Sequence, residues 1–529
     1  MKKIFTLVAA AFCSMQMMAK DYTCPLTINL SGYDMPVGNI DVTVDDQGDG
    51  KYTLKLINFD MAGSMPVGNV VVSDVEATKC GNTIMLNAQK AIQITAGDKK
   101  DAEGNDQEWL GPSLGNVNIL FKGELKGDNF NAILNIPVAG SMIVGVKLGE
   151  EANSLGQLPN SSFENFHEAK YGKATSSEPN NWHTFMSATG GLVSSVASAV
   201  HTWESTEVRE EEGIESKKCV KIASTPVKFL GIPVASANGT ITTGRLQAGS
   251  ASASNPDNCA FLDLSNKELD ANSDPFYTVL NNKPDYIKAW VKFHAGDGNK
   301  NPKATISALL TNGEYAQDPE KEDYNANIIA RANNSAIEST DEWQEIVIPF
   351  TYADKETMPK AALVTISTCA VPSGGSMSEK DPDVLYVDDI EMVYDADIKQ
   401  ITLDGNDITD NFDEYDSYEI DNYGKDIDLN NITVEATGAG AFITKSINSD
   451  EENTYVTLTV TSNDLKTYDV RTITFNGITT GIKNAQSITT PNGVQAIYNV
   501  NGQQVSNMTS GNVYIIKTTD GKTVKFVKK

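Results

Sequence analysis

The stretch Phe130-Asn-Ala-Ile-Leu-Asn-Ile-Pro-Val138 carries an apolar side chain at every second position, from Phe130 through Leu134 to Val138. Successive side chains of a β-strand point to opposite faces, so this alternation predicts a strand with one buried face. Residues Tyr52 to Leu56 alternate in the same way. Similar runs between Gly, Asn and Asp turns fill the chain, and no long helical pattern appears, so we predict an all-β protein.

A short motif is repeated near the start of the chain. Met35-Pro-Val-Gly-Asn39 recurs as Met65-Pro-Val-Gly-Asn69, and each copy precedes an alternating apolar run. Glycines at such places suit tight turns or the bends of a barrel. Residues 20–150 hold about eight or nine expected strands, the number that closes an up-and-down barrel.

Through this strand pattern and the repeated motif, residues Tyr22 to Gly149 resemble the calycin-like (lipocalin-like) domain of bacterial surface proteins. The resemblance implies a barrel whose interior can hold an apolar ligand. Because eight strands barely leave a cavity, we expect side chains to fill the interior, and a lipid-binding barrel is the alternative.

A second domain is expected at residues 158–396, where six motifs follow one another. They are Leu158-Pro-Asn-Ser-Ser-Phe-Glu-Asn-Phe166, Asn180-Asn-Trp-His183, Asn238-Gly-Thr-Ile-Thr-Thr-Gly-Arg-Leu246, Tyr286-Ile-Lys-Ala-Trp-Val-Lys-Phe293, Trp343-Gln-Glu-Ile-Val-Ile-Pro-Phe-Thr-Tyr352 and Leu385-Tyr-Val-Asp-Asp-Ile-Glu-Met-Val-Tyr394. They resemble the family called "putative carbohydrate metabolism domain", and the first and last also occur in jelly-roll carbohydrate-binding modules. The resemblance implies a two-sheet jelly-roll sandwich, and the alternation from Ile287 to Phe293 agrees with it.

Two smaller regions follow. Residues 397–478 are acidic, and their short, regularly spaced strands predict an immunoglobulin-like β-sandwich that acts as a spacer. Residues 480–529 contain Ala496-Ile-Tyr-Asn-Val-Asn-Gly-Gln-Gln-Val505 and end in basic side chains. They resemble the C-terminal sorting domain of type IX secretion cargo, which implies passage across the outer membrane and surface anchoring. The alternative is an ordinary terminal β-domain.

Residues 1–19 have the three parts of a secretory signal peptide. Lys2 and Lys3 are basic, an apolar run extends from Ile4 to Phe12, and Met17-Met18-Ala19 offers a cleavage site after Ala19. The run is too short to span a bilayer, and no later stretch approaches that length. We therefore expect secretion to the outer cell surface, with the secretion and surface-attachment machinery as partners.

The formal net charge of -28 argues against nucleic acid as a partner, because neutralising phosphates takes clustered Lys and Arg. Of the six cysteines, Cys13 lies in the leader, and an odd number remains. Bridges between Cys24 and Cys80 and between Cys219 and Cys259 are conceivable. Otherwise we expect buried, apolar thiols.

The chemical motifs of common enzymes are missing. The four histidines form no His-Glu-x-x-His pair, and no Gly-x-Ser-x-Gly elbow occurs. A sugar-binding face needs exposed rings, and the candidates in the second domain are Trp182, Trp203, Tyr277, Tyr315 and Tyr324. The alternative for each ring is core packing, because aromatic side chains dominate protein cores.

The jelly-roll resemblance also implies a structural calcium ion between the first and last strands. Glu164 and Asp388 match the positions that such modules use, and calcium takes six to eight oxygen ligands. The alternative is that both carboxylates accept hydrogen bonds and join the two ends without metal.

We therefore predict a surface protein that binds a glycan through its second domain, and we favour binding over catalysis. One alternative is a glycoside-active enzyme that uses two carboxylates of that domain. The other is a structural or adhesive surface protein with a lipid-binding or filled barrel.

Overall fold

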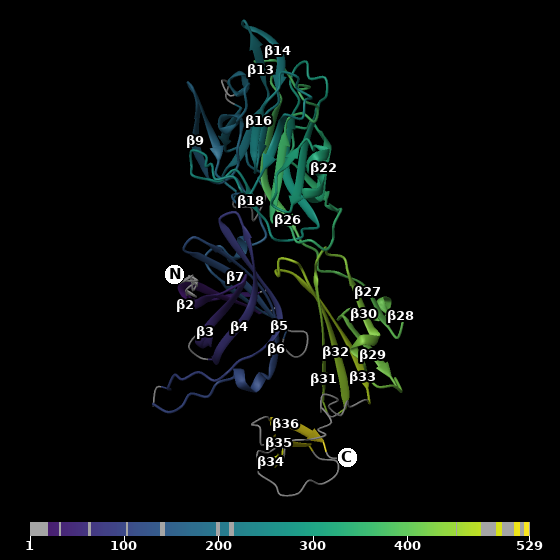
Figure 1. Ribbon diagram of the computed structural model, residues 1–529. Coiled ribbons are helices and arrows are strands. Elements are labelled where there is room, and N and C mark those ends of the chain that lie inside the picture. Colours follow the sequence, from purple (N-terminus) through teal and green to yellow (C-terminus); the bar gives the residue numbers. More distant parts are fainter. Residues whose placement is uncertain are drawn as a thin grey trace, which may run out of the picture.

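The computed structural model describes residues 19–30, 33–61, 65–101, 104–137, 143–196, 201–210, 216–450, 452–477, 494–499, 513–518 and 523–527. They form a barrel, a large sandwich, a smaller sandwich and a three-stranded sheet (Figure 1), which confirms the all-β prediction. But for Ala19, the predicted signal peptide lies outside the described residues. None of the described helices is long and apolar enough to cross a membrane.

Helical structure is short throughout the described ranges. The helices are η1 (Gly111–Leu114), η2 (Ala152–Ser154), η3 (Phe185–Ser187), α1 (Val193–Val196), η4 (Glu322–Asn327), η5 (Thr409–Asn411) and η6 (Leu429–Asn431).

The first unit is a closed, antiparallel, eight-stranded barrel in which β8 returns to pair with β1. Its strands are β1 (Ala19–Leu30), β2 (Tyr33–Gly48), β3 (Lys51–Met61), β4 (Met65–Cys80), β5 (Thr83–Gln93), β6 (Asn116–Lys126), β7 (Asn129–Pro137) and β8 (Ile143–Leu148). Apolar side chains from all eight strands pack into one cluster inside the barrel. Phe130, Ala132 and Leu134 belong to it, as their spacing predicts.

The repeated motif marks two equivalent bends in the barrel wall. Gly38 and Gly68 have φ angles of 119° and 118°, a region that glycine reaches far more easily than other residues. Each glycine lies next to a register shift between paired strands. A Cβ on Gly68 would lie 2.2 Å from the Thr95 carbonyl oxygen, so the chain also passes too close for any other residue.

The second unit is built around two facing sheets. One has the order β11-β12-β26-β19-β23 and the other β15-β25-β20-β22-β24, with β18 also paired to β25. The strands are β11 (Thr202–Ser205), β12 (Cys219–Ala223), β15 (Thr240–Thr242), β18 (Thr278–Val279), β19 (Tyr286–His294), β20 (Lys303–Thr311), β22 (Ile328–Glu338), β23 (Gln344–Pro349), β24 (Thr351–Tyr352), β25 (Ala361–Ser367) and β26 (Val384–Val393). Ile287, Ala289, Val291 and Phe293 lie in the core between the sheets, whereas the alternate residues of β19 face outward.

Smaller sheets flank this sandwich. They comprise the hairpins β9 (Phe166–Tyr171) with β10 (Ala174–Pro179) and β13 (Thr225–Phe229) with β14 (Ile232–Ala237), and the sheet of β16 (Arg245–Ala248), β17 (Asn258–Leu262) and β21 (Ala316–Asp318).

The third unit is a small sandwich of a three-stranded and a four-stranded sheet, and β29 pairs with β33 in parallel. Its strands are β27 (Ile398–Leu403), β28 (Asn406–Asp407), β29 (Ser417–Asp421), β30 (Ile432–Ala436), β31 (Phe442–Ser449), β32 (Asn453–Thr461) and β33 (Tyr468–Asn476). The strands β34 (Val494–Asn499), β35 (Val513–Thr518) and β36 (Thr523–Val527) form the last sheet.

The barrel, the large sandwich and the small sandwich meet at one junction (Figure 1). Asn463, in the turn between β32 and β33, accepts hydrogen bonds from Lys122 of the barrel and from the Lys283 backbone of the large sandwich. The Asn135 amide of the barrel donates to the Leu465 carbonyl at 2.8 Å. The three units are therefore tied to one another by hydrogen bonds from one turn.

The conceivable disulfides do not form. Cys24, Cys80, Cys219, Cys259 and Cys369 are all free and buried. Cys24 is on β1 and Cys80 on β4, which are not neighbours in the barrel, and Cys219 and Cys259 belong to different sheets. Both proposed pairings were wrong, and the thiols are buried as we expected of apolar residues.

Candidate functional site

The outer face of the five-stranded sheet carries a row of aromatic and basic side chains. Strand register aligns Trp203 on β11 with Lys221 on β12, Lys221 with Tyr386 on β26, and Tyr386 with Lys292 on β19. Their neighbours along the strands point into the core, so these side chains point outward. The Trp203 side chain is 37% exposed, which is high for so large an apolar ring. We call this set the outer-face row.

Lys221 lies between the two rings of the outer-face row. Its ammonium nitrogen is 5.6 Å from the Trp203 ring centroid and 5.7 Å from that of Tyr386. Lys292 is paired with Glu207 at 2.9 Å, whereas Lys221 has no ion-pair partner among the residues that the structure describes. The row therefore combines two aromatic rings with one cation that has no ion-pair partner in the part of the chain that the structure describes.

A groove of about 660 Å³ continues along the same face toward the third unit. Trp290 contributes an aromatic ring, and the Arg209 guanidinium stacks on it at 4.1 Å from the ring centroid. Arg209 is ion-paired with Asp389, and Lys288 with Glu391 at 2.5 Å. The groove therefore has polar walls whose charges are largely paired.

The structure brings together two of the predicted rings in a different place. Tyr315 and Tyr324 lie beside the small sheet of β16, β17 and β21, with ring centroids 4.5 Å apart. Tyr315 also stacks on Phe261 at 5.6 Å. All three rings are half-buried, so they form a second aromatic patch that is separate in the fold from Trp203.

The other two predicted rings do not offer a free surface. Trp182 is fully buried in the core, 5.2 Å from the Phe163 ring, and its indole N–H donates to the Pro159 carbonyl. The Tyr277 hydroxyl accepts a hydrogen bond from the Asn82 backbone across the barrel junction. Both rings therefore hold the structure together, which is the alternative we gave for each candidate.

The predicted calcium ligands do lie together. The Ser216 hydroxyl is 3.3 Å from a Glu164 oxygen and 2.9 Å from an Asp388 oxygen. The same Glu164 oxygen accepts the backbone N–H groups of Lys217 and Lys218. A calcium ion would need further oxygen ligands here, but hydrogen-bond donors surround the Glu164 oxygen instead. The arrangement therefore fits two carboxylates that join the ends through hydrogen bonds better than it fits a calcium site. Burial, followed by the nearby Asp389 charge, raises the pKa of Asp388 to about 7.

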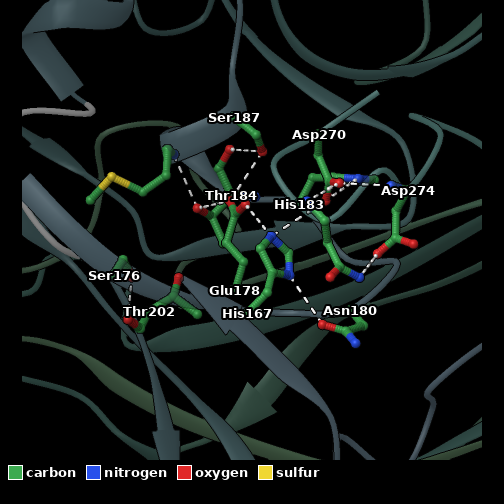
Figure 2. A network of polar contacts seen from close by, with 12 residues as sticks. His167, Ser176, Glu178, Asn180, His183, Thr184, Ser187, Thr202, Asp270 and Asp274 are labelled. Atoms are coloured by element: carbon green, nitrogen blue, oxygen red, sulfur yellow. Dashed lines mark hydrogen bonds and ion pairs between the residues drawn. The ribbon is translucent and has the colours of Figure 1, made fainter. Parts of the chain in front are cut away.

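A second polar cluster, at the β9–β10 hairpin, was not foreseen (Figure 2). His167 on β9 faces Glu178 on β10, and its Nε2 atom is 3.7 Å from Glu178 Oε2 and 3.5 Å from Asp270 Oδ2. His183 Nε2 is also 3.5 Å from Asp270 Oδ2. We call these four residues the histidine–carboxylate cluster.

The electrostatics of the cluster favour the charged forms of His167 and Asp270. Burial lowers the pKa of His167, but Glu178, Asn180 and Asp270 outweigh burial and raise it overall. Burial raises the pKa of Asp270, but His183 and other partners outweigh burial and lower it. Imidazoles and carboxylates that stabilise each other's charged forms are therefore the chemical character of this cluster.

The sequence contained one signal for this cluster. In Asn180-Asn-Trp-His183 we singled out the ring of Trp182, whereas the side chain that joins the cluster is its neighbour His183. A search for His-Glu-x-x-His passes over the pair because His167 and Glu178 face each other across a hairpin, and no such short spacing joins them.

The barrel is similar to a known family of domains. Residues 18–148, about a quarter of the chain, match the model of the calycin-like beta-barrel domain, which confirms that part of the resemblance. No curated protein matches the chain.

Three solved structures have a similar arrangement over part of the chain. A "putative glycoside hydrolase" from Bacteroides vulgatus has 17% identity and a TM-score of 0.32, over 44% of this chain and 96% of that one. Another, from Bacteroides thetaiotaomicron, has 14% identity and a TM-score of 0.28, over 70% and 84%. An arabinose-bound α-L-arabinofuranosidase has 10% identity and a TM-score of 0.20, over 44% and 25%. With TM-scores below 0.5, these likenesses do not bear on function.

Proposed function

We propose that this is an exported cell-surface protein that binds a glycan on the outer face of its five-stranded sheet. The observation that carries the proposal is the exposed Trp203 ring aligned with Lys221 and Tyr386. Pyranose rings present C–H groups that pack on flat aromatic faces, and an ammonium donates hydrogen bonds to sugar oxygens. Trp203 and Tyr386 are two strands apart, about 10 Å, which suits a ligand of two or more sugar rings.

The charge of Lys221 indicates which glycans we expect to be preferred. The chain is acidic overall, yet the outer-face row holds Lys221 without an ion-pair partner among the described residues. A sugar carboxylate would supply that partner and gain a charge-assisted hydrogen bond. We therefore expect glycans that contain uronic acids to bind more tightly than neutral ones.

Export is supported by the leader of residues 1–19 and by the C-terminal stretch that resembles a type IX sorting domain. The mature protein should begin at Lys20. N-terminal sequencing of protein from the producing cell, together with protease treatment of intact cells, tests cleavage and surface exposure.

Trp203→Ala is the test of the binding face. Truncating an aromatic that anchors a ligand typically weakens binding by about 2 kcal/mol, or about 30-fold. A glycan array on the whole protein identifies a ligand, and calorimetry then compares the variants. Tyr415→Ala is the matched control, because Tyr415 is a 79% exposed ring in the third unit.

The expected result is that W203A loses binding while Y415A keeps it, and that Lys221→Met weakens binding of uronic-acid glycans most. Equal binding by W203A and wild type would contradict the proposed face. Release of shorter sugars during the assay would instead favour the glycoside-active alternative.

A further inference from the structure

The hairpin of β13 and β14 ends in a group of apolar side chains that is largely open to solvent. Leu230 is 87% exposed, and Phe229, Ile232 and Val234 are between 58% and 67% exposed. Single exposed apolar side chains are ordinary on a protein surface, whereas a contiguous group of large ones usually marks a contact site. We call these four residues the hairpin tip.

The hairpin projects from the second unit on an anchored base. The strands β13 and β14 form a two-stranded sheet of their own, and Figure 1 shows them at the end of the second unit that lies away from the barrel. The Ser236 backbone exchanges hydrogen bonds with the Ser373 hydroxyl, and the Ser236 hydroxyl donates to the Ser376 carbonyl at 3.0 Å. The hairpin tip is therefore held away from the body of the protein.

Strand register separates the apolar side chains from the nearest charge. Phe229 pairs with Ile232 across the hairpin, and the adjacent pair, Lys228 with Pro233, points to the opposite face. Lys228 is ion-paired with Glu379, which compensates its charge. The face that carries Phe229 and Ile232 is therefore an uncharged apolar surface.

The turn of the hairpin has an unusual residue at its most exposed position. Leu230 and Gly231 have φ angles of 50° and 82°, so the two-residue turn has the positive φ values of type I′, which favours Asn-Gly or Asp-Gly. Leucine is disfavoured there both by its backbone angle and by its exposure to water. Folding does not explain this choice, and an apolar phase around the turn would explain it.

The small area of the hairpin tip argues against a second copy or another protein as its partner. At about 30 Å² for each exposed carbon, the four side chains offer roughly 400 Å². A stable protein–protein interface takes about 800 Å² from each partner. A lipid bilayer needs no matching surface, and an amphipathic segment binds to it in proportion to the apolar area that it buries.

We propose that the hairpin tip inserts into the apolar layer of an electrically neutral lipid bilayer and so attaches the second unit to a membrane surface. The net charge of -28 disfavours anionic lipid headgroups, which attract clustered lysine and arginine. The hairpin belongs to a different sheet from the outer-face row, so membrane attachment is independent of the proposed glycan binding.

The expected attachment is weak and reversible. A single myristoyl chain binds a bilayer with an association constant of about 10⁴ M⁻¹, and a tip of a few apolar side chains should bind with a constant of that order. Half of the protein should therefore be bound at about 0.1 mM accessible lipid, the inverse of that constant.

Cosedimentation with vesicles of phosphatidylcholine tests the proposal. The whole protein is used with the predicted leader removed, so that the apolar run of the leader does not contribute. Leu230→Asn should weaken binding at least about 10-fold, because it removes a large apolar side chain from the bilayer. Its melting temperature should not fall, because asparagine is favoured at this turn position. Ile232→Thr should also weaken binding, since threonine keeps the β-branched shape that suits a strand.

Leu269→Asn is the matched control, because Leu269 is a 55% exposed leucine in another loop of the same unit. It should bind vesicles as wild type does. Wild-type protein that stays in solution at about 5 mM lipid, far above the expected midpoint, would overturn the proposal. Binding that requires phosphatidylglycerol in the vesicles would also overturn it, because charge would then be the cause. Self-association of wild type that Leu230→Asn abolishes would show instead that a second copy covers the hairpin tip.

Discussion

Replacing Lys122 by Met should remove a pH dependence that arises at the three-unit junction. Lys122, on β6, donates hydrogen bonds to the Asn281 carbonyl at 3.3 Å and the Asn463 side chain at 3.2 Å. Burial lowers the pKa of Lys122 to about 7, although the Asp464 charge partly opposes this. In the unfolded chain a lysine titrates near pH 10.4.

The direction of this pH dependence follows from the number of protons that the folded and unfolded chains bind. Between about pH 7 and 10.4 the unfolded chain holds more protons than the folded protein, so stability rises with pH across that interval. The penalty for burying the ammonium is fully present below pH 7 and amounts to about 4 to 5 kcal/mol. Between pH 6 and pH 9, wild type should therefore gain about 2.6 kcal/mol relative to Lys122→Met, as an order of magnitude.

Urea unfolding followed by tryptophan fluorescence at pH 6, 7.5 and 9 measures this difference. Separation of the units and complete unfolding both return the ammonium to water, so either transition reports it. Lys126→Met, at the exposed end of the same strand, should keep the wild-type pH dependence. Parallel pH profiles for wild type and K122M would refute the argument.

Three further predictions concern the glycine contact at the barrel junction and the Glu164–Asp388 pair. Gly81→Ala should lower the melting temperature more than Gly127→Ala. The two glycines have nearly equal φ angles of 61° and 60°, so the backbone cost of the substitution is matched. A Cβ at Gly81 would lie 2.5 Å from the Tyr277 hydroxyl, whereas a Cβ at Gly127 would meet open space. Equal melting temperatures in a calorimeter would show that the Tyr277 contact is unimportant. In urea unfolding, the stability of Asp388→Asn relative to wild type should rise by about 2 to 3 kcal/mol from pH 5 to pH 8. The reason is that the pKa of Asp388 is about 7 in the folded protein, so the stability of wild type falls as the pH rises from about 4 to 7. Identical pH profiles for both proteins would count against this pKa. Millimolar CaCl₂ should raise the melting temperature no more than MgCl₂ does, since hydrogen bonds already satisfy Glu164; a selective rise with CaCl₂ would restore the calcium prediction.

Much of the fold could be predicted because apolar and polar residues alternate along a strand that buries one face. The alternation at Phe130, Ala132 and Leu134 and at Ile287 to Phe293 identifies buried faces correctly. The repeated Met-Pro-Val-Gly-Asn motif predicts bends, and Gly38 and Gly68 occur at two equivalent ones. These features depend only on neighbours along the chain, and period two is enough to find them.

The side-chain constellations could not be predicted, because they depend on which strands become neighbours. The pairing of Trp203 with Lys221 and Tyr386 follows from a sheet order that places β12 beside β26, strands far apart in sequence. His167 meets Asp270 for the same kind of reason. The free cysteines have the same explanation. The spacing of Cys24 and Cys80 along the chain does not reveal the strand order that separates them in the barrel.

The junction at Asn463 has a mechanical consequence. The β32–β33 turn is bonded to the barrel and to the large sandwich at the same time, so a load applied along β33 is divided between both. Under such a load the barrel and the large sandwich would be pulled together, because neither can move away from the turn without breaking its own hydrogen bonds.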